Sequence, residues 1–356
     1  MRDLIQGNCI VYTVASTDYL TQALATIKSV HKHNPTFSYF IFLVDLSKED
    51  SVDLSLKLNE ELDFEVDLLG YYSLDVEDTR LFEKSLKYFN KFEICCLMKY
   101  LAACFLFKNY CDRYENCIFL DADTYVVSSF SAVLADVKQY ALSLTPHEIG
   151  PSQSQREIEY LFQGWINAGF FIINFRNSVL NQILNWLKYR IVCHGFYAPE
   201  YDICGEQQWL SFLPLIFPNE VHILQDVGLN VAYWNLDHRK LSRTESGVKV
   251  NNEELFFLHY SGRQSKSMYL SKHSKFLLNS CTVLCELTAE YDELVLNTMS
   301  YEVRSSISFI NKNISFRLKQ GSSMNETSIR VNPLFSNRIF LLYHFFFKHT
   351  KKLKLW

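Results

Sequence analysis

The chain has 356 residues, of which 48% are hydrophobic and 15% aromatic, and its formal net charge is −4 at neutral pH. This apolar content excludes an intrinsically disordered protein, and the length suffices for one large domain or two ordinary ones. The negative charge argues against a nucleic-acid binder, because no overall positive field would attract a phosphate backbone, so a phosphate-bearing ligand must be held by local groups.

The cysteines indicate a reducing compartment. The chain has ten of them, and its first residues, MRDLIQGNCIVYTVAS, lack the basic segment and long apolar run of a secretion signal. We therefore expect free thiols and a cytoplasmic location. The pairs Cys95-Cys96 and Cys281 with Cys285 do not have zinc-ribbon spacing, so we interpret the cysteines as small buried hydrophobic residues.

The C-terminal end combines an aromatic run with a basic end. Residues 339–347 read IFLLYHFFF, four lysines follow between residues 348 and 354, and no acidic residue follows Glu326. This pattern is typical of a segment that lies on an anionic membrane surface, and it equally fits a terminal helix docked on the protein. The first alternative predicts peripheral contact with the inner face of the plasma membrane.

Residues 1–120 alternate between short apolar runs and longer segments with helical periodicity. Strands are predicted at 9–15, 39–44, 64–69 and 117–120, and helices at 19–31 and 92–107. This alternation predicts an α/β fold with a mostly parallel sheet and helices on both faces.

The pattern after residue 140 is more mixed. Strands are predicted at 140–147, 167–175, 221–224 and 255–261, and helices at 179–192, 206–213 and about 272–300. No internal repeat or low-complexity linker divides the chain. We therefore expect one catalytic domain over residues 1–270 and a helical extension over 271–356 that carries the basic aromatic tail.

The stretch CIFLDADTYVV, residues 117–127, places two carboxylates at the end of a predicted strand. Asp121 and Asp123 are separated by Ala122, so both can face one side and bind one divalent cation. In open α/β sheets ligands bind beyond the carboxyl ends of the strands, where this pair lies. A hairpin turn is the alternative, because Asp and Thr are common in turns and the triplet alone is not specific.

Five stretches resemble, in chain order, the nucleotide-sugar glycosyltransferases with the GT-A fold, and more narrowly glycosyltransferase family 8. They are YTVASTDYLTQALATIKSVHKHNP (12–35), FLDADTYV (119–126), WINAGFFIINF (165–175), GEQQWLSFL (205–213) and FLHYSGRQSK (257–266). Two further stretches, LTPH (144–147) and NVAYWNL (230–236), resemble a bacterial subset that builds surface polysaccharides. The resemblance covers residues 8–266 and implies a GT-A, Rossmann-like fold and a nucleotide-diphosphate sugar donor, most often linked to UDP.

The resemblance implies a metal site that includes the DxD motif. Asp121 and Asp123 would bind Mn²⁺ or Mg²⁺, with His259 as the third protein ligand and Ala122 in contact with the donor. A set of oxygen and nitrogen ligands suits Mn²⁺ better than Ca²⁺. Without the resemblance, His259 would be interpreted as a core histidine on an apolar strand.

The same resemblance assigns residues to the diphosphate and the nucleoside. Gly262 would let the backbone approach the diphosphate, and either Arg263 or Lys266 would pair with it, because the family's lysine lies closer to the glycine. Ala15, Ser16 and Tyr19 match the positions that hold base and ribose, although the family often has a carboxylate at the place of Ser16.

Lys99 and four further residues are implied at the donor sugar. Lys99 matches a basic position that reaches the sugar or its phosphate, and a lysine inside CCLMKYLAACFLF is otherwise costly to bury. Asn167 and Gly169 would lie at the sugar, with Glu206 and Gln207 beside the anomeric carbon, and the family transfers with retention of configuration. His147 is either an acceptor contact or a structural histidine.

The sequence therefore predicts a metal-dependent glycosyltransferase that acts on a bacterial surface glycan or a lipid-linked acceptor. A sugar-nucleotide nucleotidyltransferase is an alternative with a similar core, but it needs a glycine-rich basic loop after the first strand, and VASTDYLTQ has neither feature. A sugar-binding scaffold without activity is the second alternative. Retention of Asp121, Asp123, His259 and Gln207 together disfavours it.

Overall fold

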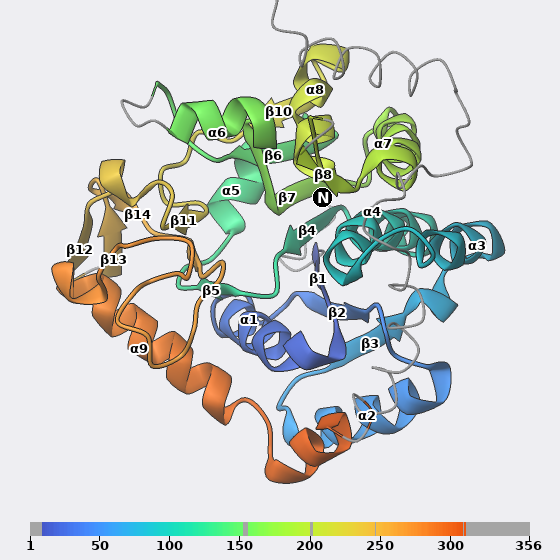
Figure 1. Ribbon diagram of the computed structural model, residues 1–356, viewed down its shortest axis with the longest axis horizontal. Coiled ribbons are helices and arrows are strands. Elements are labelled where there is room, and N and C mark those ends of the chain that lie inside the picture. Colours follow the sequence, from blue (N-terminus) through green and yellow to red (C-terminus); the bar gives the residue numbers. More distant parts are fainter. Residues whose placement is uncertain (1–8, 152–155, 200–201, 246, 309, 311–356) are drawn as a thin grey trace, which may run out of the picture.

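The computed structural model describes residues 9–151, 156–199, 202–245, 247–308 and 310. Among these residues, seven strands form the main sheet in the order β10-β6-β7-β4-β1-β2-β3 (Figure 1). The strands are β1 (Cys9–Ala15), β2 (Ser38–Leu43), β3 (Val66–Gly70), β4 (Asn116–Leu120), β6 (Leu142–Pro146), β7 (Ile166–Asn174) and β10 (Val221–Ile223). All neighbours pair in parallel except β7, which is antiparallel to β4 and β6. The predicted α/β architecture with a mostly parallel sheet is confirmed.

Helices flank this sheet on both faces. The helices labelled in Figure 1 are α1 (Leu20–His33), α2 (Lys48–Glu61), α3 (Val76–Ser85), α4 (Lys91–Tyr110), α5 (Ser131–Asp136), α6 (Arg156–Gln163), α7 (Leu180–His194), α8 (Glu206–Ile216) and α9 (Thr282–Asn297). A further helical segment covers residues 301–308. Tyr12 of β1 belongs to the core under α4, α7 and α8, whereas its neighbour Val11 belongs to the core under α1 and α2. Because successive side chains of a strand face opposite sides, β1 is buried along its whole length and has no polar alternation.

A small second sheet brings distant parts of the chain together. It consists of β11 (Val231–Ala232), β15 (Phe257–His259) and β5 (Thr124–Val126), in that order. β5 follows the DxD motif directly, and its antiparallel register with β15 places His259 opposite Thr124. The backbone pairing thereby carries residue 259 to the end of β4.

Short strands complete the described part of the chain. β8 (Tyr197–Ala198) pairs with β9 (Ile203–Cys204), and β12 (Leu241–Thr244), β13 (Gly247–Val250) and β14 (Glu253–Glu254) form a small antiparallel sheet. The sheet of β12, β13 and β14 lies at the edge of the molecule in the ribbon diagram (Figure 1).

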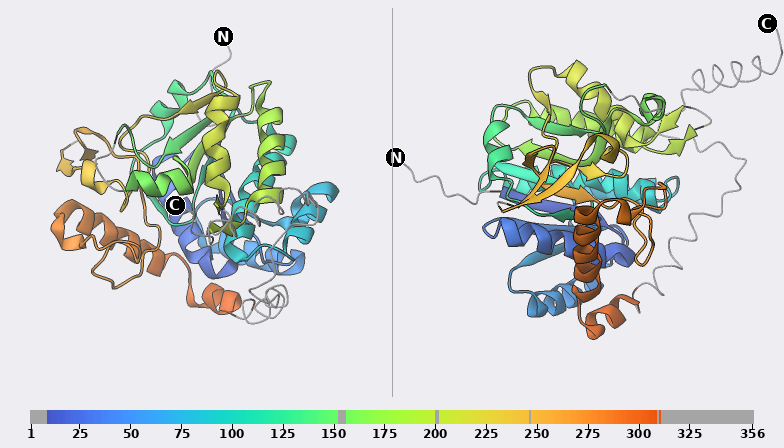
Figure 2. Two further views of the ribbon diagram at one scale, coloured as in Figure 1. Left: turned by 45° about the horizontal axis from the view of Figure 1, so that its top comes forward. Right: turned by 90° about the vertical axis from the view of Figure 1, so that its left-hand side faces the viewer.

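The expected helix over about 272–300 is wrong in its first part. Residues 272–281 form turns and a short 3₁₀ segment, and the helix α9 begins only at Thr282. The hydroxyls of Ser271 and Ser274 accept backbone N–H groups two residues ahead, at 3.1 Å each, and such local bonds compete with helix formation. α9 lies beside α1 (Figures 1 and 2). It shares a core with Leu258 of β15 and with Tyr260, which follows that strand.

The predicted basic aromatic tail falls at 339–354, outside the described residues. None of the helices that the structure describes is long and apolar enough to cross a bilayer. The choice between a membrane-surface segment and a docked helix therefore stays a prediction.

Candidate functional site

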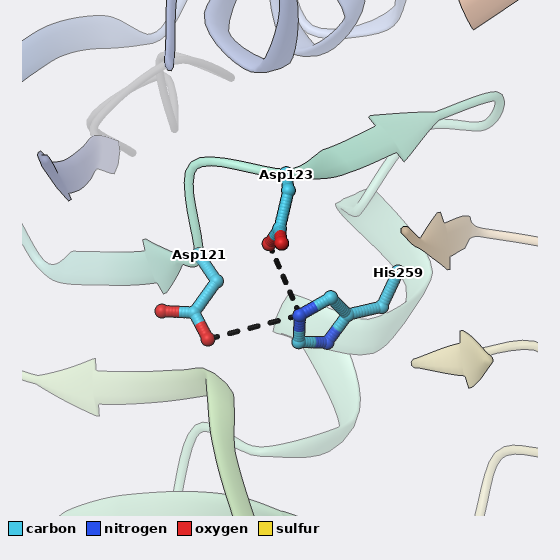
Figure 3. A group of neighbouring side chains, drawn as sticks. All are labelled: Asp121, Asp123 and His259. Carbon is cyan, nitrogen blue, oxygen red and sulfur yellow. Dashed lines mark ion pairs between the residues drawn. The ribbon is translucent and has the colours of Figure 1, made fainter. Parts of the chain in front are cut away.

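Two carboxylates and an imidazole converge beyond the carboxyl end of β4. Asp121 follows β4, Asp123 precedes β5, and His259 ends β15. His259 Nε2 lies 3.1 Å from Asp123 Oδ1 and 3.8 Å from Asp121 Oδ2 (Figure 3). One ligand atom from each residue lies within 4.8 Å of the others, so the three can hold one metal ion. The structure brings together the three residues that the sequence predicted as metal ligands.

The loop that carries the carboxylates is fixed by its backbone. The N–H of Asp121 donates to the Gly169 carbonyl at 2.8 Å, and the carbonyl of Asp123 accepts from the Tyr260 N–H at 2.8 Å. The Thr26 hydroxyl, on α1, lies 2.9 Å from the carbonyls of both Ala122 and Thr124. The loop is therefore held in place by its neighbours before any ligand binds, and sequence reasoning missed the part of Thr26.

Lys99 of α4 lies between two acidic residues. Its Nζ is 2.9 Å from Asp121 Oδ1 and 3.4 Å from Glu206 Oε1, and it donates to the Ala168 carbonyl at 3.2 Å. Burial opposes the ammonium charge, but Asp121 and Glu206 outweigh it and raise the pKa of Lys99 well above its ordinary value. These partners explain how a lysine can stand inside an apolar helix.

The two aspartates have pKa values that are shifted in opposite directions. Burial raises the pKa of Asp121, even though Lys99 and His259 oppose the shift. Burial acts on Asp123 too, but there the ion pair with His259 outweighs it and lowers the pKa. Burial alone would lower the pKa of His259, but the interaction with Asp123 outweighs this effect, so the pKa is raised. His259 thus serves as a counter-charge to the carboxylates.

A buried amide network adjoins this cluster. Gln207, in the first turn of α8, accepts through Oε1 from the Ala168 N–H at 3.0 Å and from Asn167 Nδ2 at 3.2 Å. A Cβ at Gly169 would lie 2.5 Å from His259 Cε1 and would clash with the ring. Because glycine has no side chain, β7 can pack directly against the imidazole. Gly164 has a φ of +98°, and a Cβ there would lie 2.6 Å from the Gln207 carbonyl. Two glycines thus allow the close packing of β7, α8 and His259.

His147 is buried within the same network. Its Nδ1 lies 3.2 Å from the Trp165 carbonyl and its Nε2 lies 3.2 Å from Asn167 Nδ2. Burial lowers its pKa to about 4. With both ring nitrogens engaged, the structure favours the structural role for His147 over an acceptor contact.

The predicted nucleoside residues lie where β1 ends. Ala15 and Ser16 are buried, whereas Tyr19 is 47% exposed. The Ser16 hydroxyl donates to Asp18, and Lys91 pairs with Asp18 at 2.7 Å. Burial and the charge of Asp123 raise the pKa of Tyr19.

The loop after β15 carries the two basic residues that were predicted, as alternatives, to bind the diphosphate, and their surroundings differ. Gly262 has a φ of +69°, and a Cβ there would lie 2.7 Å from His273 Cδ2. Arg263 pairs with Asp292 of α9 at 2.6 Å and donates to the Ser267 carbonyl at 2.9 Å. Lys266 is exposed and also has a φ of +69°. The Arg263 guanidinium is thus already bonded to groups of the protein, whereas Lys266 lies exposed at the surface.

No family model matches this chain. A curated protein of Bacillus subtilis (strain 168), the uncharacterized protein YfnD, is 25% identical over 259 residues, which cover 70% of this chain and 76% of YfnD.

The chain is also similar to several solved structures. The glycosyltransferase GlyE of Streptococcus pneumoniae TIGR4 matches with a TM-score of 0.47 and 16% identity over 87% of this chain, which spans 64% of the GlyE chain. The galactosyltransferase LgtC in complex with donor and acceptor sugar analogs matches with a TM-score of 0.44 and 14% identity, over 83% of this chain and 99% of LgtC. Mouse xyloside xylosyltransferase 1 matches with a TM-score of 0.43 and 13% identity, over 71% of this chain and 96% of that protein. These three proteins are a glycosyltransferase, a galactosyltransferase and a xylosyltransferase.

Proposed function

We propose that this protein is a metal-dependent glycosyltransferase that moves a sugar from a nucleotide-diphosphate donor, linked to UDP, to a bacterial surface glycan or a lipid-linked acceptor. The observation that carries the proposal is the convergence of Asp121, Asp123 and His259 from separate parts of the chain beyond the end of β4. Lys99 joins this cluster to Glu206, which stands where the family has an aspartate, and Gln207 follows Glu206 on α8.

The donor atoms of the cluster fit Mn²⁺ or Mg²⁺. Two carboxylates offer hard oxygen ligands and His259 offers a nitrogen, a combination that favours Mn²⁺ over Ca²⁺. A divalent cation held there supplies positive charge to the diphosphate as it leaves the sugar. Asp121 contributes one oxygen to this cluster while its other oxygen faces Lys99.

The remaining roles are proposed from the family resemblance. We assign Ala15, Ser16 and Tyr19 to the base and ribose, Ala122 and Gly169 to the donor, and Gly262 with either Arg263 or Lys266 to the diphosphate. Asn167, Glu206 and Gln207 border the reacting carbon. Lys99 pairs with Asp121 and Glu206 and offsets the charge of both carboxylates. Retention of configuration is proposed from the family motifs.

A nucleotide-release assay tests the proposal. The protein is incubated with a panel of UDP-sugars, with Mn²⁺ or with EDTA, and free UDP is measured. We expect Mn²⁺-dependent release with at least one donor, and a loss of about 100-fold or more in Asp123→Asn. Asp53→Asn is the matched control, because Asp53 is an exposed residue in a surface ion pair with Lys57.

Two outcomes would overturn the proposal. If no UDP-sugar gives metal-dependent release, the protein is not a transferase of this kind. If donors raise the melting temperature in Mn²⁺ but are never cleaved, the protein is a sugar-nucleotide-binding scaffold.

We also propose peripheral membrane contact through the tail, on the basis of its aromatic and basic residues. Deleting the residues after 333 should release the protein from anionic vesicles, and unchanged vesicle binding would contradict this part.

A further inference from the structure

A fully buried asparagine links the proposed metal ligand His259 to the sugar-side residues. Asn230 lies just before β11, is 0% exposed and has a φ of +54°. Its Oδ1 is 2.9 Å from His259 Nδ1, and its Nδ2 donates to Asn167 Oδ1 at 3.0 Å. Asparagine tolerates this left-handed backbone better than most residues. The roles proposed above do not use Asn230.

The direction of each hydrogen bond is set by a backbone amide. The Gly169 N–H donates to Asn167 at 2.9 Å, and because an N–H can only donate, the atom that it meets must be the side-chain oxygen. Asn230 must therefore present its NH₂ group to that oxygen and its own oxygen to His259. It follows that His259 Nδ1 carries a proton and donates it to Asn230 Oδ1. Nε2 is then the nitrogen that faces Asp121 and Asp123: it donates to Asp123 Oδ1 while the ring is protonated, and it would offer its lone pair to a cation once that proton is released.

The other end of the network is fixed by the same reasoning. The Ala168 N–H donates to Gln207 at 3.0 Å, so the Gln207 atom at that position is the oxygen Oε1. Asn167 Nδ2 donates to this same oxygen at 3.2 Å. All bonds therefore run in one direction, from His259 through Asn230 and Asn167 to Gln207, and each amide orientation depends on its neighbour.

We propose that Asn230 is a positioning residue that fixes the tautomer of His259 for metal binding and couples it to the orientation of Gln207. We call the series His259–Asn230–Asn167–Gln207 the amide relay. Partners that hold the second nitrogen of a metal-binding histidine orient its ring and raise its basicity. The metal-binding half of this inference rests on the function proposed above, whereas the hydrogen-bond directions rest on the backbone amides alone.

Two substitutions of Asn230 separate the halves of the amide relay. Asn230→Gly keeps the left-handed backbone and removes both bonds, whereas Asn230→Asp keeps the acceptor for His259 and removes the donor to Asn167. The matched control is Asn235→Ala, since Asn235 is equally buried, lies in the same segment, and bonds backbone groups, including the carbonyls of Asn230 and His147.

The effect of Asn230 on metal binding is tested by measuring Mn²⁺ affinity with electron paramagnetic resonance, a measurement that does not depend on enzymatic activity. We expect the affinity to fall about 10- to 100-fold in Asn230→Gly and to change little in Asn230→Asp and Asn235→Ala. UDP release should fall in both Asn230 variants, because neither a carboxylate nor a glycine at this position can donate a hydrogen bond to the Asn167 side chain. An equal loss of Mn²⁺ affinity in Asn235→Ala would show that only the packing of this segment matters and would overturn the proposal.

The imidazole itself gives a second readout that does not need metal binding. In protein labelled with ¹⁵N-histidine, the Nδ1–H proton of His259 should exchange slowly with water in the wild type and in Asn230→Asp, and rapidly in Asn230→Gly. Assignment uses the spectrum of His259→Gln. Two results would refute the relay. One is that His259 of the wild type carries no proton on Nδ1 in the presence of Mg²⁺. The other is that the exchange of this proton is the same in Asn230→Gly as in the wild type. A wild type that binds no Mn²⁺ but shows the protected Nδ1–H would refute the proposed function and leave the relay standing.

Discussion

Replacing Lys99 with methionine is expected to destabilise the metal-free protein through the two carboxylates that it neutralises. The variant keeps a long side chain in α4 but leaves Asp121 and Glu206, 2.9 and 3.4 Å from the lost ammonium, without their partner. Removing one member of a buried ion pair costs about 3 to 5 kcal/mol, because the other charge stays buried. The Asp121 side chain is 25% exposed, so water compensates part of this cost, and we expect about 3 kcal/mol.

Urea unfolding of wild type and Lys99→Met, each with EDTA and with Mn²⁺, measures this effect. We expect Mn²⁺ to stabilise the variant more than the wild type, because the cation offsets the charge of Asp121 and no longer meets a neighbouring ammonium. Lys188→Met is the matched control, since Lys188 forms a comparably buried pair with Asp78 at 2.8 Å outside the metal cluster. It should lose similar stability and show no extra stabilisation by Mn²⁺.

A loss of unfolding free energy below about 1 kcal/mol in Lys99→Met, the size of an exposed ion pair, would contradict a buried charge-neutralising role for Lys99. This role would also be contradicted if both lysine variants responded to Mn²⁺ alike.

Three further predictions concern single residues. Gly169→Ala should weaken Mn²⁺ binding in a titration, because a Cβ there would stand 2.5 Å from the His259 ring; unchanged affinity would contradict this. Burial lowers the pKa of His147 to about 4 from an ordinary 6.5, so the wild type should lose up to about 3 kcal/mol of unfolding free energy as pH falls between these values, and His147→Gln should not. Lys266→Ala should weaken UDP binding in calorimetry more than Arg263→Lys, and the reverse order would assign the diphosphate to Arg263.

The parts of the fold that could be predicted from sequence are those with a strong periodic signal. β1 and β4 are continuous apolar runs that the sheet buries on both faces, and the predicted strand and helix positions around them agree with the structure to within a few residues. α2 and α3 were missed because their exposed faces are rich in polar and charged residues, and only a few side chains such as Leu54 and Phe82 are buried. The reversed direction of β7 has no local signal, because an antiparallel central strand is as apolar as a parallel one.

The candidate site divides in the same way. Asp121, Asp123 and His259 were predicted as one cluster from motifs, and the pairing of β5 with β15 brings them together. Thr26 and Asn230 lie in stretches that resemble the family, but neither was given a role, because their hydrogen-bond partners are far away in the sequence. The partners of Lys99 are likewise a matter of tertiary structure, since Glu206 lies on another helix.

The most direct test of the central claim is the affinity of UDP with and without Mn²⁺, measured by calorimetry in wild type and in Asp123→Ala. We predict that Mn²⁺ tightens UDP binding about tenfold or more in the wild type, and that this gain disappears in the variant. Equal UDP affinity in Mn²⁺ and in EDTA, or an undiminished gain in Asp123→Ala, would contradict a metal-diphosphate site at Asp121, Asp123 and His259.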